Sequence, residues 1–292
     1  MSMPPRIALV TCADLPLLAP DDRLAADALR ARGAEVTPAV WNDPAVRWDA
    51  FDHLVIRSPW DYHHQAGVFA RWLDDRETSG VRMSNAYATL RWNMEKTYLR
   101  ELERRGLPIV PTVWIERGAP LPLAAVLSAT GWERVVVKPT VSASAHNTWI
   151  VGPTATQEDE ERSRRLAADS GVMVQRFMGA IEHQGEWSLV YLGGTYSHAV
   201  VKRPARGDFR VQEEYGGSVE PADPPQSIRG AADAVMAAVP KGALYARVDG
   251  VMEEGAFVLM ELEALEPSLY FREGGTAAAG RFAEALLAPS AT

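Results

Sequence analysis

The fold is decided by the stretch Arg247-Val248-Asp249-Gly250-Val251 and the run Phe257-Val258-Leu259-Met260-Glu261-Leu262-Glu263 that follows it. Both runs are short, apolar and bounded by turn residues, which is typical of β-strands. The connection 252–256 is short and ends in Gly-Ala, so it predicts a hairpin loop. The sequence therefore predicts two antiparallel strands that lie side by side.

Polar residues recur at every second position in these two strands. Side chains alternate between the faces of a strand, so Arg247 shares a face with Asp249, and Glu261 shares one with Glu263. The hairpin would bring three carboxylates and a guanidinium together, and such carboxylates suit Mg²⁺, which keeps waters and phosphates in its shell. The alternative is the solvated face of an antiparallel sheet.

The first quarter of the chain alternates between strand and helix patterns. Strands are predicted at 6–11, 35–40 and 53–57, and Asp21-Asp22 is expected to cap a helix that runs to about Arg32. This alternation indicates a parallel sheet, whose ligands bind beyond the carboxyl ends of its strands. The substrate candidates at this edge are Arg57, Ser58, Trp60 and Asp61. Alternatively, Trp60 is a packed aromatic and Arg57 an ordinary salt-bridge partner.

Composition excludes several classes of protein. The chain has 292 residues and a net charge of −8, which argues against a nucleic-acid partner. No apolar stretch approaches the ~20 residues of a membrane span, and no signal pattern is present, so we expect a cytoplasmic protein. The single cysteine, Cys12, is expected to be packed, and the six histidines show no zinc-site spacing.

The usual nucleotide motifs are absent from the sequence. No G-x-G-x-x-G follows the first strand and no G-x-x-x-x-G-K-[ST] occurs, so hydride transfer and a standard P-loop are unsupported.

Two other strands end in polar residues. Val135-Val136-Val137-Lys138-Pro139 ends in a lysine and a proline, and Gly171-Val172-Met173-Val174-Gln175-Arg176-Phe177 ends in polar groups.

Taken in order, these segments resemble the ATP-grasp superfamily of carboxylate-amine ligases, from about Asn85 onward. The resemblance implies an α/β (α+β) fold in three parts. These are an N-terminal preATP-grasp domain with a parallel sheet (1–92), a first, nucleotide-binding ATP-grasp lobe (93–176) and a C-terminal lobe with an antiparallel sheet and the metal site (177–292).

The resemblance also implies a nucleotide and metal site. Lys96, expected in the first turn of a helix from Met94 to Arg105 that Asn93 caps, and Lys138 would hold phosphates, and 174–177 would be the hinge at the adenine. Either Glu186 or Glu182 would take the ribose. The implied cofactor-binding residues are Lys96, Lys138, Ser142, Gln175, Arg176, Phe177, Glu182, Glu186 and Lys202, and the implied Mg²⁺ ligands are Asp249, Glu261 and Glu263.

The chain departs from the family pattern in two places. Glu263 stands where the family commonly has Asn, and a carboxylate there can still bind Mg²⁺. The family usually has glycines after the Val-Lys-Pro strand, whereas this chain has a Ser- and Ala-rich loop at 140–147. Its small residues still allow backbone N–H groups to approach a phosphate, and the alternative is a plain loop.

Arg210 and Arg247 are the candidates for stabilising the transferred phosphoryl group, with a surface charge as the alternative for Arg210. Further substrate candidates are Gly216, Gly217, Ser268 and Tyr270. Segments such as Gly185-Glu186-Trp187-Ser188 and Glu261 to Tyr270 are similar to the glutathione-synthetase-like branch that includes the O-ureidoserine cyclo-ligase of cycloserine biosynthesis.

The resemblance implies an ADP-forming ligase that activates a small amino-acid-like carboxylate as an acyl phosphate and forms an amide or ring-closing C–N bond. The implied cofactors are ATP and Mg²⁺, with Mn²⁺ as a substitute, and a homodimer is an expectation of the same kind. Two alternatives remain, a kinase-type phosphotransferase and a catalytically silent module that binds ATP or a partner. The sequence leaves the substrate, and the choice between cyclisation and two-substrate ligation, open.

Overall fold

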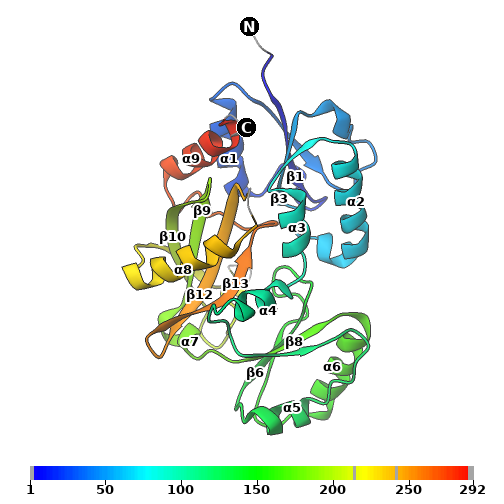
Figure 1. Cartoon of the computed structure of the whole chain (residues 1–292), viewed down its shortest axis with the longest axis vertical. Helices are drawn as coiled ribbons and strands as arrows, with labels where there is room; N and C mark the ends of the chain where they lie inside the picture. The colour runs from blue at the N-terminus through cyan, green and yellow to red at the C-terminus, as the bar shows by residue number, and fades with distance from the viewer. Residues whose placement is uncertain (1–2, 213–214, 241–242, 289–292) are drawn as a thin grey trace.

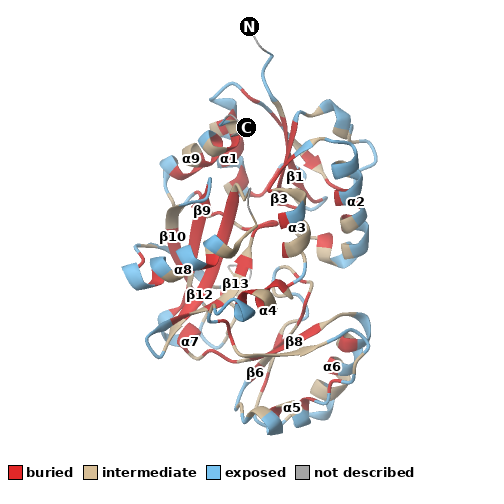
Figure 2. Ribbon diagram, viewed as in Figure 1, coloured by how far each residue is buried: buried red, intermediate tan, exposed pale blue. Residues whose placement is uncertain are grey.

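The computed structural model describes residues 3–212, 215–240 and 243–288 of the chain. Three β-sheets follow one another along the long axis of the molecule, in the order N-terminal sheet, C-terminal sheet and central sheet (Figure 1). Buried residues concentrate in the strands, and exposed residues on the outer faces of the helices (Figure 2).

The N-terminal sheet is parallel, as predicted, with the strand order β2-β1-β3-β4. Its strands are β1 (Arg6–Thr11), β2 (Glu35–Val40), β3 (His53–Ser58) and β4 (Arg82–Ser84). Its helical elements are α1 (Pro20–Arg30), η1 (Trp48–Ala50), η2 (Tyr62–Gln65), α2 (Ala66–Thr78) and α3 (Tyr87–Asn93). Cys12 is buried just after β1, as expected for a packed thiol.

Helix α1 does not begin as the sequence predicted. Ala19 precedes the helix without a capping side chain, and Pro20 occupies the first turn, where its missing N–H costs nothing. The two aspartates that were expected to cap the helix have other partners instead. Asp21 accepts hydrogen bonds from the backbone N–H groups of Phe271 and Arg272, each at 3.0 Å. The start of α1 is thus tied to a C-terminal loop.

The central lobe is an antiparallel sheet with the strand order β5-β8-β6-β7, and α5 and α6 lie together on one side of it (Figure 1). Its strands are β5 (Thr112–Ile115), β6 (Val135–Pro139), β7 (Trp149–Val151) and β8 (Val172–Arg176). Its helices are α5 (Leu123–Thr130) and α6 (Gln157–Asp169). A reciprocal pair of hydrogen bonds between Thr156 and Asp159 caps α6.

The C-terminal sheet is antiparallel with the order β11-β10-β9-β12-β13. Its strands are β9 (Glu186–Leu192), β10 (Thr195–Arg203), β11 (Ser218–Ala222), β12 (Tyr245–Glu253) and β13 (Ala256–Glu263). The helices with it are α7 (Ala180–Gln184), α8 (Gln226–Ala238) and α9 (Thr276–Leu287). The predicted hairpin is present, with Glu254 and Gly255, both at positive φ, as its two-residue turn.

Two cores cross the boundaries expected between the three parts. Helix α9 packs beside α1 in one hydrophobic cluster that also includes residues of β1 and β9. Helix α4 (Tyr98–Arg104) packs through Leu99 and Leu102 onto the C-terminal sheet. The division at 92/93 and 176/177 stays a prediction.

Two buried asparagines join the N-terminal segment to the C-terminal sheet. The Asn85 amide donates to the carbonyls of Tyr245 and Ala264, at 2.7 and 2.8 Å. Asn93, expected to cap a helix, instead donates to Leu262 O at 2.7 Å and accepts from the backbone N–H groups of Ala264 and Leu265. Because buried backbone groups require partners, these amides fix the ends of β12 and β13.

Candidate active site

A row of charged and polar residues crosses one face of the C-terminal sheet. Residues opposite one another in antiparallel strands share a face, and their side chains are in contact range. The pairs in this row are Lys202 with Glu186 (β10 with β9), Asp249 with Ser188 (β12 with β9), and Asp249 with Glu261 and Arg247 with Glu263 (β12 with β13). The shared face predicted for the hairpin is confirmed.

A bulge in β13 modifies the strict alternation of the hairpin. Asp249 is opposite Glu261, but Gly250 is opposite Leu259, so Met260 is an extra residue on β13. Both Met260 and Glu261 line the same cavity. Gly250 leaves no room for a side chain, because a Cβ atom there would lie 2.4 Å from the Phe257 ring.

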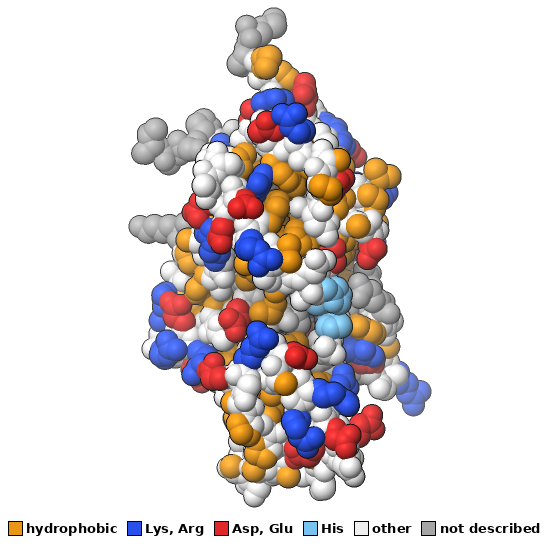
Figure 3. Space-filling model, turned by 90° about the vertical axis from the view of Figure 1, so that its right-hand side faces the viewer, with side chains coloured by type: hydrophobic (Ala, Val, Ile, Leu, Met, Phe, Trp, Pro, Cys, Tyr) orange, Lys and Arg blue, Asp and Glu red, His pale blue; other side chains and the backbone are white. Residues whose placement is uncertain are grey.

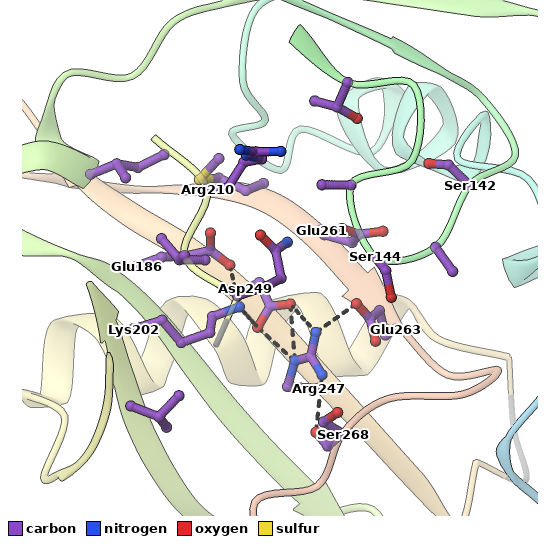
Figure 4. Close-up of a pocket in the computed structure, with 18 of the residues that line it drawn as sticks. Ser142, Ser144, Glu186, Lys202, Arg210, Arg247, Asp249, Glu261, Glu263 and Ser268 are labelled. Carbon is purple, nitrogen blue, oxygen red and sulfur yellow. Dashed lines mark hydrogen bonds and ion pairs between the residues drawn. The ribbon is translucent and has the colours of Figure 1, made fainter. Parts of the chain in front are cut away.

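This face forms one wall of a cavity of about 430 Å³, a volume typical of small-molecule sites. The C-terminal sheet, the ends of β6 and β8, the loop after β6 and the 266–273 loop all contribute to it (Figure 4). The predicted residues that line it are Trp60, Lys96, Lys138, Ser142, Gln175, Arg176, Phe177, Glu186, Lys202, Arg210, Arg247, Asp249, Glu261, Glu263, Ser268 and Tyr270.

Arg247 is the centre of the hydrogen-bond network in this cavity. Its guanidinium donates to both oxygens of Asp249, at 2.8–3.0 Å, to Glu263 Oε1 at 2.5 Å and to Ser268 O at 3.0 Å (Figure 4). Ser188 Oγ donates to Asp249 Oδ1 at 2.5 Å. These contacts hold the pKa of Asp249 at about 2 despite its burial, so Asp249 is ionised at neutral pH.

Two of the three lysines in the cavity have carboxylate partners. Lys202 Nζ lies 2.6 Å from Glu186 Oε1 and 3.6 Å from Asp249 Oδ1. Lys96 Nζ lies 3.0 Å from Glu261 Oε1 and donates to Ser142 O at 2.7 Å. Lys96 belongs to the turn between α3 and α4 and not to a first helical turn, because α4 begins only at Tyr98.

Lys138, at the end of β6, differs from the other two lysines. In the part of the chain that the structure describes, no hydrogen bond or ion pair holds its ammonium group. Burial lowers its pKa, and the charge of Glu261 opposes this effect only in part. A half-buried cation without a direct partner favours an anionic ligand, because the ligand would supply the missing charge.

Several carboxylates lie close to one another in the cavity. Burial raises the pKa of Glu263 to about 7, with further contributions from Glu261 and Asp249. Burial and the neighbouring glutamates also raise the pKa of Glu266 to about 8. A divalent cation would relieve this repulsion and return both groups to their charged forms.

The oxygen-only donor set of Asp249, Glu261 and Glu263 fits Mg²⁺ chemically. These carboxylates do not gather as a preformed cluster. Among the described residues, the only group of three or more acidic, histidine or cysteine side chains with one ligand atom each within 4.8 Å of the others consists of histidines. Arg247 lies between Asp249 and Glu263 and holds them apart. A bound Mg²⁺ would therefore draw its remaining ligands from phosphates and water.

The hinge predicted at the adenine site lies at the end of β8. Gln175 is buried and donates from its amide to Thr112 Oγ1 at 3.0 Å. The guanidinium of Arg134 stacks on the Phe177 ring with its carbon 3.7 Å from the ring centroid, which fixes this ring at the cavity. Arg210, which lines the cavity, pairs with Asp208 at 2.7 Å and lies 3.6 Å over the Tyr215 ring.

Three N-terminal substrate candidates lie outside the cavity lining. Arg57 is fully buried and donates to Asp22 and to Pro267 O, so in this structure it is a salt-bridge partner, which was the alternative interpretation of this residue. The hydroxyl of Ser58 lies 3.1 Å from that of Thr11, and Asp61 accepts from Trp41 Nε1 at 2.7 Å. In this structure the polar groups of all three residues serve the packing of the N-terminal part, and their substrate roles stay predictions.

Three further predicted residues also lie outside the lining. Gly216 and Gly217 follow the loop that carries Arg210, and Gly217 packs against the Val211 carbonyl. Glu182, the competing choice for the ribose, is on α7 and pairs with Arg134 at 3.0 Å. Of the two glutamates, only Glu186 lines the cavity.

Several lining residues carried no sequence signal strong enough to single them out. They include Asp21, Thr148 and Glu266. Glu266 follows the hairpin in a coil, where strand alternation no longer says which way a side chain points. Trp60 does reach the cavity, and its indole N–H donates to Glu266 O at 3.1 Å.

The cavity lies between two antiparallel sheets and is lined by lysines, arginines and carboxylates. This arrangement is that of an ATP-grasp ligase. Comparison with known proteins supports this class. The model of the N-terminal domain of D-cycloserine synthetase DcsG matches residues 7–85. The cycloserine biosynthesis protein DcsG of Streptomyces lavendulae is 30% identical over 275 residues, which is 89% of this chain and 90% of that protein.

Several solved structures share the fold of this chain. The crystal structure of D-cycloserine synthetase DcsG matches with a TM-score of 0.86 and 27% identity, over 96% of this chain and 98% of that one. A D-alanine–D-alanine ligase from Bacillus anthracis complexed with ATP matches at 0.67 and 16%, over 96% and 94%. The ligase PsnB with Mg and ADP matches at 0.63 and 14%, over 98% and 99%.

The chain belongs to the DcsG family of ATP-grasp ligases. The ATP-grasp fold and the ATP-dependent C–N ligase class predicted from the sequence are thereby confirmed, together with ATP and Mg²⁺ as the cofactors of the class and a small molecule as its type of substrate. Among the described residues, no helix is long and apolar enough to span a membrane.

Proposed function

We propose that this chain closes a ring in a small amino-acid-like substrate, by phosphorylating the substrate carboxylate with ATP and letting a nitrogen of the same molecule displace the phosphate. The observation that carries the proposal is the single cavity in which three lysines, Arg247 and the hairpin carboxylates converge. Ring closure, as opposed to joining two substrates, is supported by the relatives that are cycloserine proteins.

The reaction has two steps, phosphorylation of the carboxylate and attack by the nitrogen on the acyl phosphate. A carboxylate oxygen attacks the γ-phosphorus of ATP, so a P–O bond forms to the substrate and the bond to ADP breaks. The nitrogen then attacks the acyl carbon, phosphate leaves with the C–O bonding electrons, and the nitrogen loses a proton. Positioning and charge neutralisation supply most of the rate enhancement in such transfers.

The unliganded network suggests how the nucleotide is bound. Lys96 and Lys202 are paired with Glu261 and Glu186, and Lys138 has no direct partner. Phosphate oxygens would replace the carboxylates as partners of the lysines. Mg²⁺ would neutralise Asp249, Glu261 and Glu263 and would supply charge stabilisation at the transferred phosphoryl group. Binding thus exchanges one set of ion pairs for another. Mn²⁺ shares the oxygen preference and can replace Mg²⁺.

The other residues have roles that follow from their positions. Glu186, and not Glu182, is the group we assign to the ribose, because it lines the cavity. Gln175, Arg176 and Phe177 flank the base, and Ser142 lies in the loop over the phosphates. Arg210 and Arg247 face the developing negative charge. Trp60, Ser268 and Tyr270 are left for the substrate, and the Tyr270 ring lies 5.5 Å from the Arg247 guanidinium carbon.

The kinase-type and silent-module alternatives gain nothing from the relatives, which are ligases. A cytoplasmic location, a homodimer and the absence of a nucleic-acid partner stay predictions from the sequence.

The test is ADP release with Mg-ATP across amino acids, dipeptides and ureido- or aminooxy-bearing serine analogues, with product masses followed in the same tubes. We expect substrate-dependent ADP together with a product that has lost the elements of water. A condensed product from two substrates would contradict ring closure and keep the ligase, and ADP release that needs no nitrogen nucleophile would support the kinase alternative.

Lys138→Met is expected to weaken the binding of Mg-ATP about 10- to 100-fold, because it removes a charged donor worth about 1.5–3 kcal/mol. Isothermal titration calorimetry measures this loss. Arg203→Met is the matched control, since Arg203 is an exposed cation that pairs with Glu220 across β10 and β11. An unchanged affinity in Lys138→Met would exclude this lysine from the phosphate site.

A further inference from the structure

Three of the six histidines come together when the chain folds. His63 and His64 belong to η2 in the N-terminal part, and His146 belongs to the loop between β6 and β7. The ring centroids lie 4.0 Å apart for His63 and His64, and 4.9 Å from each of these to His146. One nitrogen of each residue lies within 4.8 Å of the other two. Histidine side chains form a patch on the surface, at the level where the central lobe meets the rest of the molecule (Figure 3).

The hydrogen bonding of His63 prepares one nitrogen as a ligand. Its Nδ1 lies 2.9 Å from Trp60 O, and a carbonyl oxygen only accepts, so Nδ1 carries the proton. Nε2 then has a free lone pair. That atom is buried and has no hydrogen-bond partner among the described residues. A ligating histidine typically has this arrangement, with the non-ligating N–H donated to a carbonyl or a carboxylate.

The other two histidines can complete a site. His64 and His146 are exposed, so their rings can turn toward a common point at little cost. Asn147 Nδ2 donates to His146 Nε2 at 3.0 Å, and an ion bound to that nitrogen would displace this exposed contact. Burial and the neighbouring rings lower the pKa of His63 to about 4, and burial also lowers that of His146. Neutral imidazole is the form that binds metals.

We propose that His63, His64 and His146 form a binding site for one divalent transition-metal ion such as Zn²⁺, and that this ion ties the 140–148 loop to the N-terminal part. Three histidines leave a fourth position for water, a donor set common for Zn²⁺. Imidazole ligands discriminate against Mg²⁺, so the site is chemically distinct from the hairpin carboxylates.

The position of the loop gives the site a consequence. Ser142, Ser144 and Thr148 line the main cavity from the same loop that carries His146. The loop also includes Ser144, Ala145 and Asn147 at positive φ, a conformation that non-glycine residues rarely adopt. An ion that bridges His146 to η2 would hold this loop over the cavity in one conformation.

The test uses untagged, chelator-treated full-length protein in excess Mg²⁺, so that the carboxylate site does not compete for the added metal. Titration with Zn²⁺, and with Co²⁺ as an optical probe, is expected to give one ion per chain and the visible absorption of a low-coordinate Co²⁺ site. Zn²⁺ is also expected to slow hydrogen exchange of the backbone amides in 140–148.

His146→Ala is expected to weaken the binding of Zn²⁺ and Co²⁺ at least tenfold and to abolish the metal-dependent protection of the loop. His146 is exposed, so this variant keeps the fold even where His63→Ala, at a half-buried position, does not. His183→Ala, which removes an exposed histidine on α7, is the matched control and should bind like the wild type. Equal stoichiometry and affinity in His146→Ala and the wild type would overturn the proposal.

Discussion

Replacing Asp249 by Asn, or Glu261 by Gln, is expected to reduce ADP release at least about a thousandfold, which corresponds to about 4 kcal/mol of lost transition-state stabilisation. Both changes remove a negative charge from the wall at which we propose that Mg²⁺ binds, and both keep the shape of the side chain. Asp249 is opposite Glu261 across the hairpin, so either change leaves one carboxylate fewer between the same two strands. Steady-state kinetics over a range of Mg²⁺ concentrations measure the loss.

The two variants must be separated from simple unfolding. Arg247 retains Glu263 and Ser268 O as partners in Asp249→Asn, and Lys96 retains Ser142 O in Glu261→Gln, so neither buried cation is left without an acceptor. Thermal melting should therefore change little. Glu220→Gln, on exposed β11, is the control that removes a carboxylate from the same sheet outside the cavity. Wild-type-like turnover in both site variants would contradict the assignment of Asp249 and Glu261 as Mg²⁺ ligands.

The alternation of side chains along the two hairpin strands was enough to predict which charged residues of the candidate site lie together. Arg247, Asp249, Glu261 and Glu263 were placed together because a hairpin of short apolar strands has a two-residue period and a turn that admits Gly255. The bulge at Met260 did not disturb that result, because it lies before both glutamates on β13 and shifts only the register toward the turn.

The contacts that sequence reasoning did not predict have a common cause, because they join residues that are far apart along the chain. Arg57 follows a strand end, where ligands often bind, and nothing local indicates that Asp22 and Pro267 O will enclose it. The histidine cluster joins positions 63–64 to 146, and no spacing rule connects a short helix to a loop in another sheet. Residues that meet only through tertiary packing leave no periodic signal.

The start of α4 shows a different limit. Asn93 followed by Met94 looks like a cap, and Lys96 like a first-turn residue. The amide of Asn93 instead satisfies three backbone groups at the end of β13 and just after it. The chain turns at 94–97 as a result, and this turn delivers Lys96 to the cavity.

Asp22→Ala is expected to lower the free energy of unfolding by about 3–5 kcal/mol, because it leaves the Arg57 charge buried without its anion. The side chains of Arg57 and Asp22 are 0% and 3% exposed, and their closest atoms lie 2.9 Å apart. The pair is costly even when intact, since Arg57 Nη1 and Asp22 Oδ2 have no hydrogen-bond partner among the described residues. Urea denaturation with constant m-values measures the change.

Asp52→Ala supplies the matched control, because the Arg6–Asp52 pair is about half exposed and such pairs contribute about 0–1 kcal/mol. The double variant Asp22→Leu with Arg57→Met should recover most of the lost stability, since an apolar pair of similar volume needs no compensating charge. If Arg57 were instead a substrate-binding group, Asp22→Ala would spare stability and mainly raise the KM of the substrate.

The double variant also tests how Arg57 serves the site at a distance. Arg57 donates to Pro267 O at 2.6 Å and stacks 4.9 Å over the Tyr245 ring, so it positions the loop that carries Glu266, Ser268 and Tyr270. A methionine restores the packing but not that hydrogen bond. We therefore expect the double variant to be stable and to have a reduced kcat with near-normal affinity for Mg-ATP, because the residues that we assign to the base, the ribose and the bound phosphates lie outside this loop.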